Sequence, residues 1–189
     1  MENYRLEGKT FVIDDYDRLP AFSSFLPGLA GVKGIPMWTF YTNRGQGMNS
    51  FGIDNKGNAI MEFNSANTAF ENTTVKGFRT FLKIDGEYYE PFFKYEKEAK
   101  RQIRMNKNSF KIIETNEKYG IEVTVNYFIL PNESIGALVR QVSVKNISDS
   151  AKDIEVIDGL PKIITYGISN GEFKEMSNLF KSWAYIKNI

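Results

Sequence analysis

The segment PMWTFYTNRGQGMNSFG holds the side chains of this sequence that are best suited to binding chemistry. Asn43 and Gln46 supply amide donors and acceptors, and Arg44 supplies a planar fork of donors. These groups match the hydroxyls of a sugar, and the Trp38 and Tyr41 rings can stack on the apolar face of a pyranose. We expect a substrate-binding loop here. The alternative is a loop that satisfies its own buried carbonyls, with Trp38 in the core.

The composition restricts catalysis, because the chain contains no cysteine and no histidine. This excludes disulfides, Cys/His zinc sites and nucleophiles activated by histidine. Asp14, Asp15 and Asp17 could supply the paired carboxylates of inverting glycoside cleavage. Adjacent residues of a strand point to opposite faces, however, so Asp14 and Asp15 do not pair simply. We therefore predict turn capping or a salt bridge to Arg18 for these acids, and no catalytic residue, metal site or cofactor in this chain.

Length and composition indicate one globular domain. The chain has 189 residues, and its 24 basic and 23 acidic residues nearly cancel. This balance argues against nucleic acid or an anionic membrane as a partner. The first residues, MENYRLEGKT, lack the basic and then apolar pattern of a secretory signal. No apolar stretch is long enough to span a bilayer, so we expect a cytoplasmic protein.

Short β-prone segments separated by turn residues predict a chain made mainly of strands. Such segments occupy 10–16 and 36–42, and turn signals at 54–58 and 85–86 predict two hairpins. The segment 22–36 is rich in proline and glycine, and we predict a loop for it.

The second half of the chain predicts an antiparallel meander after a charged connector at 96–108. Ile121, Val123 and Val125 alternate with polar residues, which is the period of a half-buried strand. Polar turns separate four such segments, at 109–115, 119–131, 135–148 and 152–161. We therefore predict an all-β fold over residues 1–166, an antiparallel β-sandwich or an open barrel.

The character of the sequence changes after residue 166. Ser169 and Glu172 form a capping box, with serine at the N-cap and glutamate three residues later. Large apolar residues then recur at helical spacing, at Phe173, Met176, Phe180 and Trp183. We predict an amphipathic linker helix within 167–189, whose apolar stripe forms an interface with the sandwich or with a partner.

Three long strings resemble the N-terminal region of large bacterial glycoside phosphorylases. They are VIDDYDRLPAFSSFLPGLAGVKGIPMWTFYTNRGQGMNSFG, AIMEFNSANTAFENTTVKGFRTFLKI and EVIDGLPKIITYG, and they occur in this order over most of the chain. The family is glycoside hydrolase family 94, the cellobiose and cellodextrin phosphorylases. The similarity is closest to its members that act on 1,2-β-oligoglucans.

The resemblance implies an enzyme that cleaves β-linked gluco-oligosaccharides with inorganic phosphate, releasing an α-sugar 1-phosphate with inversion. It implies a supersandwich domain, a helical linker and then an (α/α)6 barrel that holds the catalytic aspartate and the phosphate. The barrel lies outside this sequence, so we expect a fragment that is not catalytic alone. It would shape the substrate cleft and the interface of a homodimer. The rival hypotheses are a stand-alone carbohydrate-binding module and a purely structural or assembly domain.

Overall fold

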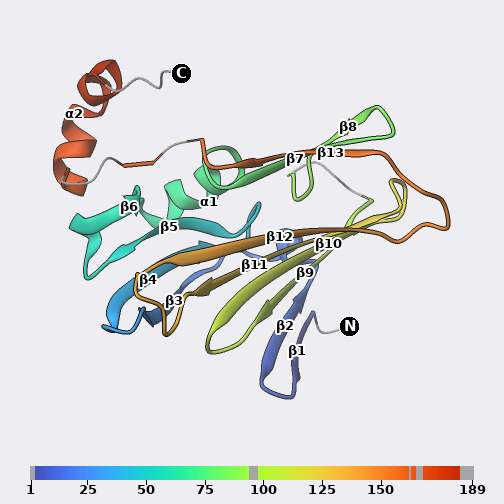
Figure 1. The fold of residues 1–189 in the computed structure, drawn as a ribbon, viewed down its shortest axis with the longest axis horizontal. Coiled ribbons are helices and arrows are strands. Elements are labelled where there is room, and N and C mark those ends of the chain that lie inside the picture. Colours follow the sequence, from blue (N-terminus) through green and yellow to red (C-terminus); the bar gives the residue numbers. More distant parts are fainter. Residues whose placement is uncertain (1–2, 94–97, 162, 165–167, 184–189) are drawn as a thin grey trace.

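The strands form two antiparallel layers, so the predicted β-sandwich is confirmed (Figure 1). The computed structural model describes residues 3–93, 98–161, 163–164 and 168–183. The first layer is a six-stranded sheet of order β1-β2-β9-β10-β11-β12. Its strands are β1 (Tyr4–Glu7), β2 (Thr10–Asp14), β9 (Lys100–Met105), β10 (Ser109–Asn116), β11 (Ile121–Ile129) and β12 (Leu138–Asn146).

The second layer consists of two smaller sheets. One has the order β3-β4-β5-β6, with β3 (Ser23–Ala30), β4 (Ile35–Thr42), β5 (Met48–Ile53) and β6 (Ala59–Met61). The other has the order β13-β7-β8, with β7 (Arg79–Ile84), β8 (Glu87–Tyr89) and β13 (Ile154–Gly159). In Figure 1, β7, β8 and β13 lie above the six-stranded sheet, and β3–β6 lie toward the end that carries α2.

Helices occupy the margins of the sandwich. Helix α1 (Ala66–Val75) lies against β5, and α2 (Asn170–Trp183) lies at the end of the molecule beside β6. Two short 3₁₀ turns, η1 (Tyr16–Arg18) and η2 (Lys56–Asn58), lie between strands. Within the described ranges, no helix is both long and apolar enough to cross a membrane.

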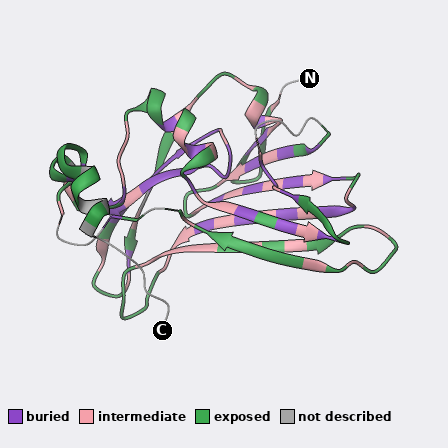
Figure 2. Ribbon diagram, turned by 90° about the horizontal axis from the view of Figure 1, so that it is seen from above, coloured by how far each residue is buried: buried purple, intermediate pink, exposed green. Residues whose placement is uncertain are grey.

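The hydrophobic core lies between the two layers because the long strands alternate strictly. Ile121, Val123 and Val125 of β11 are fully buried, whereas the residues between them are only half-buried. Figure 2 shows the same alternation along the neighbouring strands. Tyr41 from the second layer stacks on Phe110 from the first, with ring centroids 4.4 Å apart. Large side chains from both layers therefore share one core.

Two segments predicted as irregular are strands. The segment 22–36 contains β3, and the charged segment 96–108 contains β9. β3 is an edge strand, the place where a sheet tolerates proline. Gly28 lets β3 approach β11 closely, since a Cβ at this position would lie 2.6 Å from Ile129 Cδ1. Proline and glycine here mark an edge and a close approach rather than a loop.

The predicted meander is correct as far as β12 and wrong for the last strand. β10, β11 and β12 pair in sequence, but β13 crosses to the other layer and pairs with β7. Asp85 fixes the crossing, because its Oδ1 accepts a hydrogen bond of 2.9 Å from the Asp153 amide. Helix α1 was not predicted, and its weak apolar stripe explains why. The predicted boundary at residue 166 lies outside the described residues.

Candidate functional site

The loop between β4 and β5 turns its amide side chains inward. Asn43 is fully buried, and its Oδ1 accepts a hydrogen bond of 2.9 Å from the Phe22 amide. Its Nδ2 donates to the carbonyls of Tyr16 and Pro20, each at 2.9 Å. The Asn43 side chain therefore bonds the β2–β3 connection to this loop and satisfies backbone groups that would otherwise lack partners.

The Arg44 guanidinium also bonds to the β2–β3 connection. Its Nη1 donates to the Asn43 carbonyl at 2.7 Å, and its Nη2 donates to the Leu19 carbonyl at 3.0 Å. The Tyr16 hydroxyl donates to the Gly45 carbonyl at 2.7 Å. Burial raises the pKa of Tyr16 well above its ordinary value, so this hydroxyl stays a donor.

Gln46 joins a polar junction between the two layers. Its Nε2 donates to Thr80 Oγ1 at 3.0 Å, and its Oε1 accepts from Arg140 Nη2. Thr80 Oγ1 in turn donates to Asp158 Oδ1 at 2.6 Å, and Asp158 forms an ion pair with Arg140. The Arg140 Nε donates to the Tyr127 hydroxyl at 3.2 Å. These charge-assisted bonds connect β12, β7, β13 and the β4–β5 loop.

The two aromatic candidates lie on opposite faces of β4. Tyr41 faces the core, where its hydroxyl contacts Met105 Sδ at 3.1 Å. Trp38 faces outward, and its Nε1 donates to the Asn55 carbonyl at 3.3 Å. The candidate residues therefore form no single surface. The polar groups of Asn43, Arg44 and Gln46 serve buried partners, as in the alternative stated above, and sugar binding by them stays a prediction.

An aromatic cluster covers the outer face of the β3–β6 sheet. It consists of Phe25, Trp38, Phe40 and Phe63, which we call the aromatic face. Phe25 and Phe40 are cross-strand partners with ring centroids 5.0 Å apart, and Phe63 lies 5.6 Å from both Trp38 and Phe40. Phe25 is 48% exposed, so the cluster reaches the surface. The sequence reading missed it because Phe25 falls in the segment predicted as a loop.

Helix α2 packs beside the aromatic face. The capping box is confirmed, since Glu172 Oε2 accepts from the Ser169 amide at 2.9 Å and Ser169 Oγ accepts from the Glu172 amide at 3.2 Å. Phe173 is buried with Ala59 and Ile164, and Trp38 packs against the same cluster.

The residues of the predicted interface stripe along α2 differ in their exposure. Phe173 contacts the sandwich, whereas Met176 is 40% exposed. The side chains of Phe180 and Trp183 lie outside the described part of the chain.

Two of the three carboxylates considered for catalysis, Asp14 and Asp17, form ion pairs. Asp17 accepts from Arg101 at 2.7 Å, and Asp14 pairs with Arg5 and accepts from Gln102 at 2.7 Å. The ion pairs of Asp14 and Asp17 are with Arg5 and Arg101, whereas the sequence-based prediction named Arg18. Glu114, which the sequence reading did not single out, is buried and accepts from Arg101 Nε at 2.7 Å. Burial raises the pKa of Glu114, and the Arg101 charge opposes this shift.

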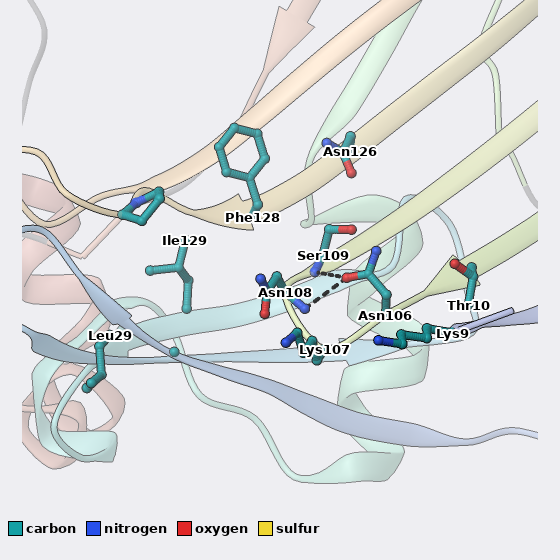
Figure 3. Close-up of a pocket in the computed structure, with 12 residues that line it drawn as sticks. Lys9, Thr10, Leu29, Asn106, Lys107, Asn108, Ser109, Asn126, Phe128 and Ile129 are labelled. Carbon is teal, nitrogen blue, oxygen red and sulfur yellow. Dashed lines mark hydrogen bonds between the residues drawn. The ribbon is translucent and has the colours of Figure 1, made fainter.

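A cleft of about 730 Å³ opens on the outer face of the six-stranded sheet, at the end where β3 crosses it (Figure 3). We call it the outer cleft. Its lining combines apolar side chains and one aromatic ring with amide, hydroxyl and ammonium groups, from Lys9, Thr10, Gly28, Leu29, Asn106, Lys107, Asn108, Ser109, Asn126, Phe128, Ile129 and Pro131. Sequence reasoning missed it because its residues come from four separate segments.

Among the residues that the structure describes, no three acidic side chains gather in a way that could hold a metal ion. No protein-family model matches this chain, and a search of curated proteins finds no match.

Proposed function

We propose that this chain is the non-catalytic β-sandwich of a glycoside phosphorylase of the family 94 type, and that it works joined to a catalytic (α/α)6 barrel. In this proposal the sandwich helps to shape a cleft for β-linked gluco-oligosaccharides and contributes to a homodimer interface. Inorganic phosphate is then a co-substrate of the whole enzyme and binds outside this chain. The resemblance of the three sequence strings supports the proposal, and so does the order of a sandwich followed by a helix.

The aromatic face is the observation that carries this proposal. The four rings gather on one face of the sheet, where Phe40 is buried and Phe25 remains exposed to water. Phe173 of α2 packs beside Trp38, so a domain that follows α2 in the chain would be delivered to this side of the sandwich. Cover by such a domain would remove Phe25, now about half exposed, from water.

The proposal is tested on the native polypeptide. An antibody against the 189-residue chain is used to isolate the protein from its source cells, and its intact mass is measured. We expect a mass several times the 21.7 kDa of this chain. The isolated protein should release an α-sugar 1-phosphate from β-linked gluco-oligosaccharides in the presence of phosphate. The 189-residue chain alone should release none.

A native polypeptide near 21.7 kDa would overturn the proposal. So would a longer polypeptide that shows no phosphorolysis of these substrates. A binding module or an assembly domain would then be the leading function. Saturable binding of neutral β-gluco-oligosaccharides that weakens in Phe25→Ser would indicate the module. A dimer in sedimentation that dissociates in Met176→Glu would indicate assembly.

A further inference from the structure

The floor of the outer cleft presents a free aromatic ring and a free amide. Phe128 and Asn126 alternate with the buried Val125 and Tyr127 on β11, so they point away from the core. Ser109 is the cross-strand partner of Phe128 on β10. Within the described part of the chain, the Phe128 ring stacks on no other ring. Phe128 is partly exposed and lines the cleft, so its ring can contact the apolar side of a ligand there.

The Asn126 side chain has unused hydrogen-bonding capacity. Its Oδ1 is buried and accepts no hydrogen bond, and no described residue accepts one from its Nδ2. A buried amide oxygen that accepts no hydrogen bond is uncommon in folded proteins. Figure 3 shows Asn126 beside Phe128 on the same side of the sheet. A ligand hydroxyl is the kind of group that such an amide binds.

The rim of the cleft is cationic. Lys9 and Lys107 are exposed, pair with no described acid, and come from the β1–β2 and β9–β10 turns. No aspartate or glutamate lines the cleft. Because cations are present without acids, the rim favours a ligand that carries negative charge at one end.

The walls of the cleft are fixed before any ligand arrives. Asn106 Oδ1 accepts hydrogen bonds from the amides of Asn108 and Ser109, at 2.8 and 2.9 Å, and so holds the turn that carries Lys107. On the opposite side, Gly28 brings β3 into contact with Ile129. A preformed site binds without a large ordering cost.

We propose that the outer cleft binds a sugar phosphate. The sugar ring stacks on Phe128, its hydroxyls bond to Asn126 and Ser109, and the phosphate lies between Lys9 and Lys107. Lysine binds phosphate as a mobile point charge and needs no bidentate geometry. This inference goes beyond the function proposed above and does not depend on it, because the outer cleft lies on a different face from the one that the proposed barrel would cover.

The test is a titration of the 189-residue chain with glucose 6-phosphate, followed by calorimetry and by amide NMR. We expect saturable binding in the range of about 0.1–1 mM, with a shift of the Asn126 side-chain amide signal. Glucose and inorganic phosphate should each bind at least about tenfold more weakly than the sugar phosphate. The variants Lys9→Ala/Lys107→Ala and Phe128→Ala should each lose at least about tenfold in affinity.

The matched control is Lys56→Ala/Lys145→Ala, which removes the same charge from residues that do not line the cleft. It should bind within about twofold of the unaltered chain. Unchanged melting temperatures identify variants that still fold. Absence of saturable binding up to about 10 mM would overturn the inference. So would equal binding of inorganic phosphate, or equal loss in the control variant.

Discussion

Arg140 and Gln46 join the two layers of the sandwich through a hydrogen bond from the guanidinium Nη2 to the amide Oε1. Arg140 lies on β12 of the six-stranded sheet, and Gln46 lies in the β4–β5 loop of the other layer. The same guanidinium pairs with Asp158 and lies 4.9 Å from the Phe78 ring centroid. The loop that looks most like a binding site in the sequence is therefore a structural link between the layers.

Replacing Gln46 with leucine should destabilise the fold. The change leaves the Arg140 Nη2 and the Thr80 hydroxyl with fewer partners in a buried site. We expect a loss of about 1–3 kcal/mol in the free energy of unfolding, measured with urea. Gln141→Leu, at the exposed neighbour of Arg140, should change it by less than about 0.5 kcal/mol. Equal effects of the two variants would contradict the structural role of Gln46.

Arg101→Met should lower the free energy of unfolding more than Gln46→Leu does, because it leaves the buried carboxylate of Glu114 without its cation. Arg101 and Glu114 are almost completely buried, with Nε and Oε2 2.7 Å apart. Breaking such a pair costs about 3–5 kcal/mol, and Arg101→Met/Glu114→Met should recover part of the loss. Lys100→Met removes only an exposed ion pair with Glu117 and should cost less than about 1 kcal/mol. Urea unfolding of the three variants measures these differences.

Stability should fall in alkaline solution as tyrosines ionise. Burial raises the pKa of Tyr127 from about 10 to about 12, although the Arg140 charge opposes the shift. Between pH 10 and 12 the unfolded chain loses this proton more readily than the folded one. The contribution of the protonated Tyr127 to the free energy of unfolding is therefore complete below pH 10. It is lost as the pH rises to 12, which lowers the free energy of unfolding by about 3 kcal/mol.

Two conservative variants check this dependence. Tyr127→Phe should flatten the fall in unfolding free energy between pH 9 and 12. Tyr88→Phe, at a side chain that is 83% exposed, should leave the fall unchanged. Parallel pH curves for Tyr127→Phe and the unaltered chain would show that Tyr127 does not cause the effect.

Alanine at Gly47 tests how tightly the β4–β5 loop packs, and alanine at Gly86, in the β7–β8 turn, is the control. Both have a positive φ, of 79° and 92°, so alanine pays a similar backbone cost at each. A Cβ at Gly47 would overlap the Phe110 ring, whereas a Cβ at Gly86 meets nothing within 4 Å. We expect Gly47→Ala to cost about 1–3 kcal/mol more than Gly86→Ala in urea unfolding. A smaller difference would mean that Phe110 moves aside easily.

Local patterns in the sequence predicted the elements that depend on local physics. The alternation of β11, the turn at Asp85 and the Ser169 capping box all agree with the structure. β3 was missed because its proline and glycine are explained only by its edge position and by the contact of Gly28 with Ile129. The pairing of β13 with β7 was missed because a strand does not encode which layer it will join.

For the candidate site too, the sequence indicated local properties but not contacts between distant segments. Residue types alone identified Asn43 and Gln46 as strong hydrogen-bonding groups, which they are. Their partners, such as the Tyr16 carbonyl and Arg140, come from distant segments, so the sequence could not show that the side chains point inward. The outer cleft was invisible for the same reason, since Lys9 and Asn126 meet only in the folded sheet.

The strand order also sets the time at which this chain can fold. β1 pairs with β2, but the other side of β2 pairs with β9, through Phe11 and Met105, so that side has no partner until about half of the chain has been synthesised. Loop closure over such separations makes folding slow, in the range of milliseconds to seconds. Until β9 leaves the ribosome, β1 and β2 form a hairpin with an open edge. A nascent chain of this kind is a natural client for chaperones that shield unpaired strands.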